Sequence, residues 1–330
     1  ACRSAIRTLK GIFVKSMVAT QASDASFVVS GGRADIAVIV VTYQSESVID
    51  RLIASLRREA ENHRLRVIVA DNSSSDKTLF LLAGHPDVSV LSTGGNLGYA
   101  AGINVAARAA YDGEPLLILN PDLVLEPGCV ETLLARMKEV KAAVVVPRIL
   151  DRENRTYRSL RREPTVAGAL GDALVGRRLA GRPAVFSEEL LHKDLYESPR
   201  RVDWATGAAL LVDSGVRVKV GDWDESFFLY SEETDYLRRV RETGGEVWYE
   251  PLAVVRHDQG GSGTSLELAK LLVVNRVRYV RKYHGRGYAT LYRGVVALRE
   301  ILRSYSSAHR ATLLTVISER RWCSLPGPVA

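Results

Sequence analysis

The sequence predicts an α/β fold with a doubly wound, mostly parallel β-sheet. Short runs rich in Val, Ile and Leu alternate with segments whose apolar residues recur at helical spacing. This alternation continues over about 110 residues, which is typical of successive β-α-β units. The runs are apolar at every position, as expected of parallel strands that helices cover on both faces.

The first half of the chain supports this class element by element. Residues 36–41 form a continuous β-branched run and are the first expected strand, and a helix with one apolar face follows from residue 48. The second strand, 66–70, ends directly at Asp71. The further expected elements are a helix at 78–82, a strand at 88–91, a helix at 100–110, a strand at 116–119, a helix at 130–140 and a strand at 142–146.

The second half is less regular. Residues 151–200 are rich in Arg, Glu and Pro and predict a long excursion over the active edge of the sheet. A strand at 207–212, a helix at 233–242 and a strand at 246–249 follow, and the chain is expected to be helical from residue 266 onward. An apolar stripe in this last region is a candidate homo-oligomer interface: Leu291, Val295, Leu298, Leu302 and Tyr305.

The positive charge of the chain, +7 in total, is concentrated at its two ends. Residues 267–330 hold 12 Lys or Arg against 3 Asp or Glu, whereas the centre is mildly acidic. Basic ends are suited to an anionic membrane surface, but the acidic centre and the lack of a nucleic-acid motif argue against a nucleic-acid binder. Residues 3–20 predict an amphipathic surface helix, and no apolar run is long enough for a transmembrane helix.

Cysteine usage gives the expected compartment. The three cysteines, Cys2, Cys129 and Cys323, are scattered and form no C-x-x-C pair. Such a set predicts neither a disulfide framework nor a zinc site. We therefore expect a reducing, cytoplasmic location.

The most informative motif is Asn120-Pro121-Asp122, which directly follows an expected buried strand. Ligands of open α/β sheets bind at the carboxyl ends of the strands, and the proline ends the strand there. The other acidic motif is Glu232-Glu233-Thr234-Asp235, and His257 stands alone further on. Together these groups predict a divalent metal that holds a diphosphate, with a separate carboxylate for proton transfer.

Two polar turns follow earlier strands. Asp71 opens the segment 71–76, which is either an ordinary turn with helix caps or a site where Asp71 accepts a hydrogen bond from a base or ribose. Residues 94–102 are glycine-rich but lack the G-x-G-x-x-G spacing. Their glycines permit close approach of the backbone to a nucleotide.

These motifs resemble those of family 2 glycosyltransferases with the GT-A fold, particularly the bacterial rhamnosyltransferase-like branch. The resemblance covers roughly residues 36–285. It is carried by six segments in family order: Val41-Thr42-Tyr43, residues 71–76, Gly95-Asn96-Leu97-Gly98-Tyr99, Asn120-Pro121-Asp122, residues 202–208 and residues 228–235.

The resemblance implies donor-binding and metal-binding roles. Thr42, Tyr43 and Asp71 would hold the base and ribose, and Asn96 and Gly98 would also face the donor. Asp122 would be the last acid of the D-x-D element that binds the metal and the sugar diphosphate, with Asn120 in place of the first acid. His257 would complete the metal shell, and Mg²⁺ or Mn²⁺ suits such an oxygen-rich site.

The resemblance also implies a catalytic base and an acceptor pocket. Glu233 would deprotonate the acceptor hydroxyl, where the family commonly has Asp, and Glu232 is able to exchange roles with it. Asp203, Trp204, Gly207 and Arg161 would line the pocket for the donor sugar and the acceptor, although a core position is the alternative for Trp204. A surface position is the alternative for Arg161.

The implied organisation is a basic N-terminal extension (1–34), a catalytic domain (35–265) and a basic helical region (266–330). Within the catalytic domain, residues 35–147 would bind the nucleotide and residues 148–265 the acceptor.

The expected function is an inverting, metal-dependent glycosyltransferase. It would move a sugar, best guessed as rhamnose from dTDP-rhamnose, to a glycan or polyprenyl-diphosphate-linked acceptor in cell-envelope polysaccharide synthesis, at the inner face of the plasma membrane. Alternatives are a hexosyl or galactofuranosyl transferase using a UDP- or GDP-sugar, or a non-catalytic nucleotide-sugar-binding protein. A sugar-1-phosphate nucleotidyltransferase is disfavoured because no glycine-rich phosphate loop follows the first strand.

Overall fold

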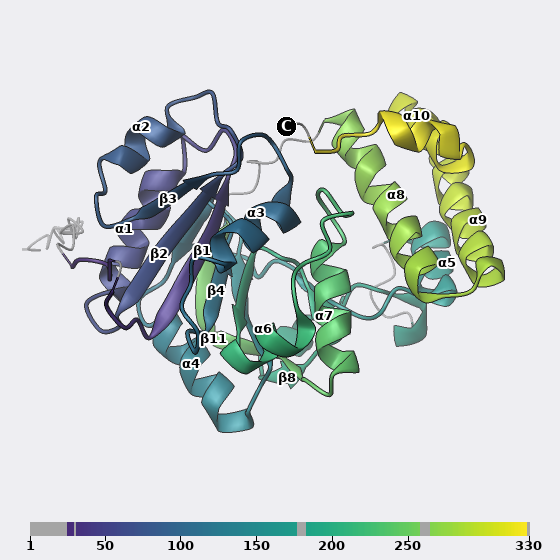
Figure 1. Cartoon of the computed structure of the whole chain (residues 1–330). Coiled ribbons are helices and arrows are strands. Elements are labelled where there is room, and N and C mark those ends of the chain that lie inside the picture. The colour runs from purple at the N-terminus through teal and green to yellow at the C-terminus, as the bar shows by residue number, and fades with distance from the viewer. Residues whose placement is uncertain (1–24, 30, 177–182, 258–264, 329–330) are drawn as a thin grey trace, which may run out of the picture.

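The computed structural model describes residues 25–29, 31–176, 183–257 and 265–328 (Figure 1). The amphipathic helix expected at residues 3–20 lies outside the described residues. Figure 1 shows a central sheet with helices on both faces and a group of helices to one side of it. The predicted α/β class is confirmed.

The sheet has the strand order β3-β2-β1-β4-β10-β6-β11-β5 among the described residues, and β8 adds to β11. The strands are β1 (Ile36–Thr42), β2 (Leu65–Asp71), β3 (Ser89–Ser92), β4 (Leu116–Leu119), β5 (Leu123–Leu125), β6 (Val144–Leu150), β8 (Arg200–Arg201), β10 (Ala209–Val212) and β11 (Val247–His257). The first four neighbours, β3 to β4, run parallel, while β10 is antiparallel to both β4 and β6. The carboxyl ends of β1, β2 and β4 therefore share one edge, as expected of a doubly wound sheet.

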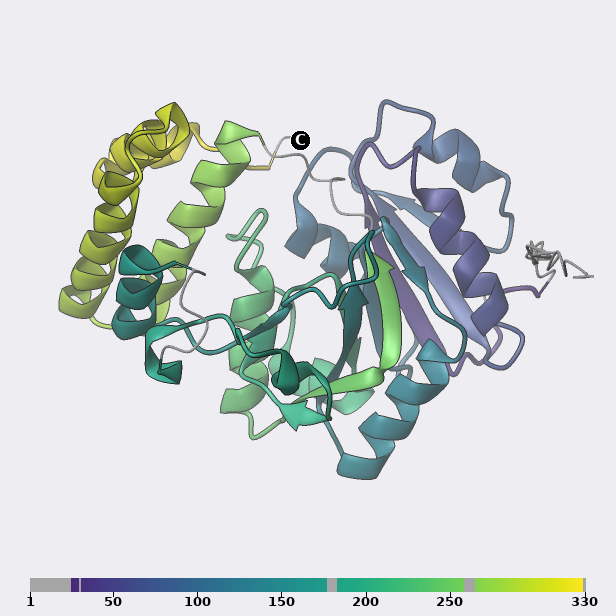
Figure 2. The ribbon, with the colours of Figure 1, turned by 180° about the vertical axis from the view of Figure 1, so that it is seen from behind.

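Helices cover the sheet on both faces. Those near the sheet are α1 (Ile49–Glu59), α2 (Thr78–Ala83), α3 (Tyr99–Ala107), α4 (Cys129–Val140), α6 (Ser214–Val220) and α7 (Glu232–Glu242). The group to one side holds α5 (Val166–Leu174), α8 (Leu266–Tyr283), α9 (Arg286–Leu302) and α10 (Ser307–Ile317), and Figure 2 shows the same grouping from behind.

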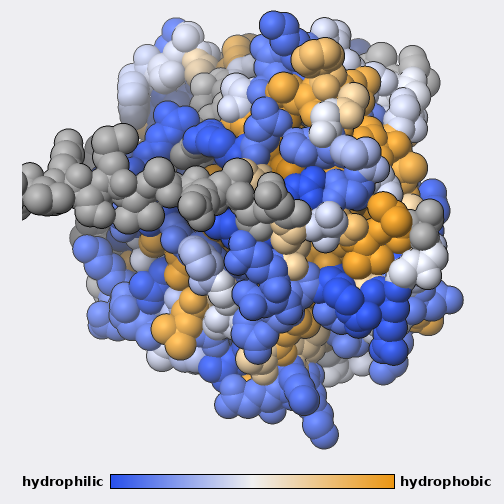
Figure 3. Space-filling model, turned by 90° about the vertical axis from the view of Figure 1, so that its left-hand side faces the viewer, coloured by the Kyte–Doolittle hydropathy of each residue, from blue (hydrophilic) through white to orange (hydrophobic). Residues whose placement is uncertain are grey.

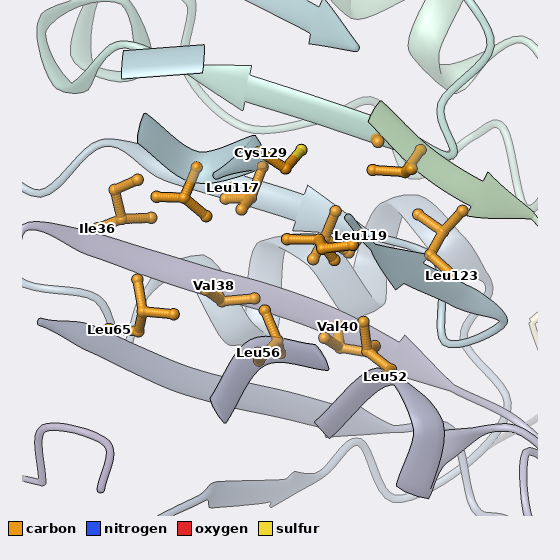
Figure 4. Close-up of a cluster of buried hydrophobic side chains, with 14 of the residues drawn as sticks. Ile36, Val38, Val40, Leu52, Leu56, Leu65, Leu117, Leu119, Leu123 and Cys129 are labelled. Atoms are coloured by element: carbon orange, nitrogen blue, oxygen red, sulfur yellow. The ribbon is translucent and has the colours of Figure 1, made fainter. Parts of the chain in front are cut away.

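Alternation along β1 divides the core between the two faces of the sheet. Ile36, Val38 and Val40 pack with residues of α1 and α4 in one cluster, which Figure 4 shows. Ala37, Ile39 and Val41 belong to a second cluster, with residues of α3 and α7. All of these β1 side chains are buried, which explains why the sequence shows no polar alternation there.

The strand that we expected at 246–249 is longer than predicted. It becomes β11 and continues to His257, although it contains Pro251. Its pairing with β6 shifts register between Glu250 and Val254, so the proline sits at an irregularity where a missing backbone donor is tolerated. The consequence is that His257 ends a strand of the central sheet. The strand expected at 207–212 begins later, at Ala209.

The excursion at 151–200 is more ordered than the sequence indicates. It contains α5, the short strand β7 (Leu160–Arg161) and two 3₁₀ helices at Ala184–Phe186 and Lys193–Tyr196. β7 pairs with β9 (Trp204–Ala205) outside the main sheet. The helix α5 packs on α9, where Arg303 donates to the carbonyl oxygens of Asp172 and Ala173 at 3.0 Å.

Polar contacts join α8 to α7. Asp235 of α7 is fully buried and accepts a hydrogen bond from the Tyr283 phenol at 2.6 Å. The same carboxylate pairs with Lys282 and, at 2.8 Å, with Arg239. Because a buried carboxylate is costly without such partners, α7 depends on α8.

The expected stripe on α9 is divided between core and surface. Val295 is buried in a third cluster formed by α5 and the C-terminal helices, whereas Leu291, Leu302 and Tyr305 are exposed. Within the described part of the chain, no helix combines the length and the apolar character that crossing a membrane requires. Figure 3 shows the opposite side of the molecule, where hydrophobic patches lie among hydrophilic side chains.

Candidate active site

The ends of β1 and β2 form the first part of the candidate site. Their parallel register sets Thr42 beside Asp71, and the Thr42 hydroxyl donates to Asp71 Oδ1 at 2.8 Å. The backbone N–H and the hydroxyl of Ser74 also donate to this carboxylate, at 2.9 and 2.6 Å. Asp71 is buried and orders the turn that follows it, as the ordinary-turn alternative for the segment 71–76 expects, and its contact with a base or ribose stays a prediction. Tyr43, next along the chain, is half exposed at the same edge.

The glycine-rich turn closes on the chain itself. Gly98 has a φ of +91°, and a β-carbon added to it would lie 2.2 Å from the carbonyl oxygen of Phe228. That oxygen accepts a hydrogen bond from Tyr99 N at 2.8 Å, and Asn96 Oδ1 accepts one from Gly98 N at 3.2 Å. At Gly98 the close neighbour is therefore the segment before α7, whereas the approach to a nucleotide that we expected of these glycines stays a prediction.

Asp122 and His257 come together at the same edge. Asp122 lies between β4 and β5, and β5 pairs with the end of β11, so His257 Nε2 stands 3.0 Å from Asp122 Oδ1. The second ring nitrogen of His257, Nδ1, is buried and has no hydrogen-bond partner among the residues that the structure describes. Asn120, two residues earlier, is held by its backbone N–H to the carbonyl oxygen of Ala208 at 2.8 Å.

This pair fits a divalent cation that also binds a substrate phosphate. In the described part of the chain, no three His, Cys, Asp or Glu side chains gather closely enough to form a complete protein metal shell. Mg²⁺ is commonly bound by one or two protein carboxylates, with the remaining positions filled by phosphate oxygens and water. Asp122 and His257 would be the protein ligands, and both are side chains that Mn²⁺ also accepts.

Glu232 and Glu233 are the first two residues of α7, and Glu232 is buried while Glu233 is partly buried. Burial raises the pKa of both carboxyls, and the neighbouring charge of Glu233 raises the pKa of Glu232 further. One oxygen of each, Oε2, is buried and finds no hydrogen-bond partner in the described part of the chain. Glu233 is the less buried of the two, and a backbone hydrogen bond from Gly207 and the charge of Arg161 favour its ionised form. Paired carboxyls with raised pKa values are suited to proton transfer.

The turn that presents this pair is strained. Tyr230 and Ser231 have φ values of +70° and +73°, which non-glycine residues rarely adopt. Two such residues in succession cost free energy, and strain of this kind is concentrated at functional sites. The buried Asn275 of α8 holds the turn through hydrogen bonds to the carbonyl oxygens of Leu229 and Tyr230, at 2.8 and 3.1 Å.

Tyr99 is a site residue to which sequence reasoning assigned no role. Its phenol donates to the carbonyl oxygen of Gly207 at 3.0 Å. Burial, and then the charges of Glu232, Glu233 and Asp122, raise its pKa, so the phenol lies among the three acids of the site. The signal was present, because Tyr99 belongs to the Gly95–Tyr99 motif.

The residues expected in the acceptor pocket are placed unequally. A β-carbon on Gly207 would lie 3.2 Å from the Glu233 β-carbon, so Gly207 adjoins the acidic pair. Trp204 is only 8% exposed, and its indole N–H donates to the carbonyl oxygen of Arg162 at 2.8 Å. The alternative of a core tryptophan therefore describes this structure, and the expected open face for a sugar ring does not.

Asp203 and Arg161 also have protein partners. Asp203 Oδ2 accepts a hydrogen bond from the backbone N–H of Glu163 at 2.8 Å. The guanidinium of Arg161 is mostly buried, 3.9 Å from Glu189, rather than on a solvated surface. Of the two, Arg161 acts on the acidic pair, since its charge lowers the pKa of Glu233.

The fold and the acidic site at the sheet edge together define a GT-A glycosyltransferase, and comparison with known proteins agrees. The family model described as "Glycosyl transferase family 2" matches residues 37–199. The N-acetylglucosaminyl-diphospho-decaprenol L-rhamnosyltransferase of Mycobacterium tuberculosis is 30% identical over 292 residues, which are 83% of this chain and 94% of that protein. The chain thus belongs to glycosyltransferase family 2 and to its rhamnosyltransferase-like branch.

Two further likenesses show how broad this relationship is. The low-salt glycan biosynthesis hexosyltransferase Agl10 of Haloferax volcanii is 31% identical over 210 residues, 63% of this chain and 62% of that protein. The crystal structure of GalNAc-T7 with UDP, GalNAc and Mn²⁺ has a TM-score of 0.58 at 14% identity, over 85% of this chain and 55% of that chain. The latter is a likeness of fold alone.

Proposed function

We propose that this transferase is inverting and metal-dependent, and that it moves a sugar, with rhamnose the first candidate, from a nucleoside diphosphate to a polyprenyl-diphosphate-linked saccharide. The observation that carries this proposal is the meeting of the Asp122–His257 pair with the Glu232–Glu233 pair around Tyr99. The similarity to a rhamnosyltransferase that is named for a lipid diphosphate acceptor supports the choice of donor and acceptor.

In the proposed reaction, Glu233 acts as the general base. Its carboxylate takes the proton of an acceptor hydroxyl while the acceptor oxygen forms a bond to the anomeric carbon of the donor. The bond from that carbon to the diphosphate oxygen breaks, and the nucleoside diphosphate leaves with the electron pair. A divalent ion at Asp122 and His257 would neutralise the charge of this leaving group.

The two glutamates are suited to different tasks. Glu233 has Gly207 and Arg161 beside it, which favour the ionised form that a base requires. Glu232 is almost fully buried, and its pKa is raised well above the ordinary value by burial and by Glu233. We therefore assign the role of the general base to Glu233. Glu232 would be a protonated neighbour that helps to hold Glu233 in position.

The proposed place of work is the inner face of the plasma membrane. Exposed apolar side chains on α9, α10 and the turn between them support it: Leu291, Ile301, Leu302, Tyr305, Leu314 and Ile317. These helices lie in the basic region of the chain, which suits an anionic lipid surface. Sedimentation with phosphatidylglycerol vesicles tests this surface, and the full chain carrying Leu302→Glu and Tyr305→Glu should sediment less than wild type. Equal sedimentation of the two would contradict it.

The experiment that tests the reaction is release of free nucleoside diphosphate from a panel of dTDP-, UDP- and GDP-sugars. Each donor is supplied with Mg²⁺, Mn²⁺ or EDTA, with and without a polyprenyl-diphosphate-linked saccharide. We expect acceptor-dependent release from one donor, which EDTA abolishes. Release that is unchanged by EDTA would rule out the metal, and a product with the anomeric configuration of the donor would rule out inversion.

A further inference from the structure

A cavity of about 550 Å³ lies on the far side of the turn that presents the acidic pair. Its walls come from the segment before α7, from α8 and from the C-terminal segment, and they include Phe227, Phe228, Arg278, Lys282, Trp322 and Cys323. Figures 1 and 2 show the yellow segment after α10 running back toward the sheet, and residues 325–328 of this segment line part of the cavity.

Among the described residues that line this cavity, two are cations, Arg278 and Lys282, and none is an acid. Lys282 is neutralised, because it pairs with Asp224 at 2.6 Å and with the buried Asp235. Arg278 differs: its Nη1 donates to Asn275 Oδ1 at 3.0 Å, and its guanidinium lies 5.7 Å from the centre of the Trp322 ring. Among the residues that the structure describes, no carboxylate pairs with Arg278.

An unpaired, half-buried guanidinium beside a cavity indicates an anionic ligand. Burial lowers the pKa of Arg278, which reflects the cost of holding its charge away from water. A phosphate group in the cavity would offset this cost through charge-assisted, bidentate hydrogen bonds. Arginine is well suited to such binding, since its planar donors match the oxygens of a phosphate.

The other walls indicate that the ligand is also apolar. Leu325 and Pro326 line the cavity and are partly exposed, while Phe227 and Trp322 line it from buried positions. A free phosphate or a nucleotide diphosphate would leave these walls without a partner. A phosphate joined to a hydrocarbon chain would contact both the guanidinium and the apolar side chains.

The cavity is linked to the active site through the turn between them. Phe228 lines the cavity, and its carbonyl oxygen is the acceptor for Tyr99 N. Asn275, which holds Tyr230 on one side, accepts from Arg278 on the other. A ligand at Arg278 therefore lies against the segment that leads directly into Glu232 and Glu233.

We propose that this cavity binds the phosphate groups and the first isoprene units of the polyprenyl-diphosphate-linked acceptor, with Arg278 contacting the phosphate. The assignment rests on the proposed function and adds to it the place where the lipid end of the acceptor is held. The saccharide end would then reach Glu233 along the turn 228–231.

Cys323 provides a readout that does not depend on activity. It lines the cavity and is exposed, whereas Cys129 is buried. The rate of Cys323 alkylation is followed by peptide mass spectrometry on the full chain. The three soluble probes are farnesyl diphosphate, farnesol, which lacks the phosphates, and inorganic diphosphate, which lacks the chain. We expect farnesyl diphosphate to slow alkylation at a concentration at least about tenfold below either of the other probes.

Substitutions identify the contact. Arg278→Gln should raise the concentration of farnesyl diphosphate for half-protection by at least about tenfold, and Arg278→Lys, which keeps the charge, should raise it less. The matched control is Arg286→Gln, an exposed position on α9 outside the cavity, which removes the same charge and should leave protection unchanged. Melting temperatures and nucleoside diphosphate binding show whether each variant is folded. If Arg278→Gln does not fold, Pro326→Glu, which adds an acid to the opposite wall, should weaken protection by the same order.

Several results would overturn the assignment. The first is protection by farnesol or by inorganic diphosphate at the same concentration as farnesyl diphosphate. The second is a loss of protection in Arg286→Gln as large as that in Arg278→Gln. The third is protection that Arg278→Gln and Pro326→Glu both leave unchanged. Protection by phosphatidylglycerol vesicles at the same lipid concentration would instead identify a membrane phospholipid as the ligand. Sugar transfer by wild type without protection of Cys323 would reject the cavity and leave the proposed function intact. Protection of Cys323 by farnesyl diphosphate without turnover of any donor would keep the cavity as a binding site and reject the proposed function.

Discussion

The side-chain amide of Asn275, in α8, donates a hydrogen bond of 3.1 Å to the carbonyl oxygen of Tyr230. Tyr230 lies two residues before the acidic pair Glu232–Glu233. Tyr230 has a positive φ, so this hydrogen bond helps to hold a conformation that the turn alone would not favour. A residue outside the stretch matched by the family model, 37–199, thereby positions the candidate base.

We expect Asn275→Ala to lower kcat because it releases the carbonyl oxygens of Leu229 and Tyr230. The loss of these buried hydrogen bonds should also cost about 1–3 kcal/mol of unfolding free energy. Val273→Ala on the same helix is the control, since Val273 is a buried core residue whose aliphatic side chain cannot form a hydrogen bond to the turn. Steady-state kinetics and denaturant unfolding check both variants, and an equal fall of kcat in the two would contradict a positioning role for Asn275.

Glu233→Gln should lower kcat by about 10²–10⁴-fold, as expected for loss of a general base. In wild type the raised pKa of Glu233 should set the acidic limb of the pH–rate profile above the ordinary value of 4.5, with the rate increasing as pH rises through it. Glu232→Gln is the matched variant, and its kcat should fall less than that of Glu233→Gln. A profile without an acidic limb, or a greater loss in Glu232→Gln, would assign the base elsewhere.

The same raised pKa values predict how stability depends on pH. A folded carboxyl with a raised pKa binds more protons than the unfolded chain does, so the free energy of unfolding falls as pH rises from about 4.5 through the folded pKa. Glu232→Gln removes the ionisable group and with it this fall in the free energy of unfolding, so it should raise the melting temperature at neutral pH. Below pH 4.5 the gain should disappear, because Glu232 is then protonated in both states. A gain of equal size at both pH values would point to a cause other than ionisation.

Two glycines permit a test of the contact between the glycine-rich turn and Phe228. Gly98 and Gly94 both have positive φ, but an added β-carbon meets the Phe228 carbonyl oxygen only at Gly98, while the space at Gly94 is open. Gly94→Ala should cost about 1–2 kcal/mol from backbone strain alone. Gly98→Ala should cost about 1–3 kcal/mol more from overpacking, measured by denaturant unfolding. Equal costs would mean that the turn and Phe228 separate readily.

Substitutions at the Asp122–His257 pair test the metal site. Asp122→Asn removes the charged ligand and should abolish the effect of Mn²⁺ on nucleoside diphosphate binding, while His257→Ala should weaken it by about 10–100-fold. Titration calorimetry in the presence of Mn²⁺ or EDTA measures both. Asp213→Asn, a helix cap away from the site, is the control. Wild-type binding that is indifferent to EDTA would exclude the predicted role.

The sequence predicted the sheet and the polar residues at its carboxyl edge well because these depend on local patterns. The apolar runs of β1, β2 and β4 and the polar residues directly after them are visible without tertiary information. The sequence predicted the bounds of an element less well where contacts between distant parts of the chain determine them. The strand expected at 246–249 continues past Pro251 to His257, because it pairs with β6 on both sides of the proline.

Burial and hydrogen bonding at single positions were also beyond the pattern. A tryptophan is a typical contact surface for a sugar ring, so the sequence alone leaves the position of Trp204 open. The pairing of β7 with β9 places it in the core. The helix α5 has a small-residue composition without a strong period, and it is ordered by α9. The role of Tyr99 depends on Gly207, which lies more than a hundred residues further along the chain.

The junction between Asp235 and α8 has a practical consequence for dissecting the protein. A chain shortened at residue 265 would lose Lys282 and Tyr283, and the carboxylate of Asp235 would retain only Arg239. Such a fragment would also lack Asn275, so its inactivity would not distinguish a missing membrane anchor from a misplaced base. The contributions of the last helices are therefore separable by surface substitutions in the intact chain, and not by deletion.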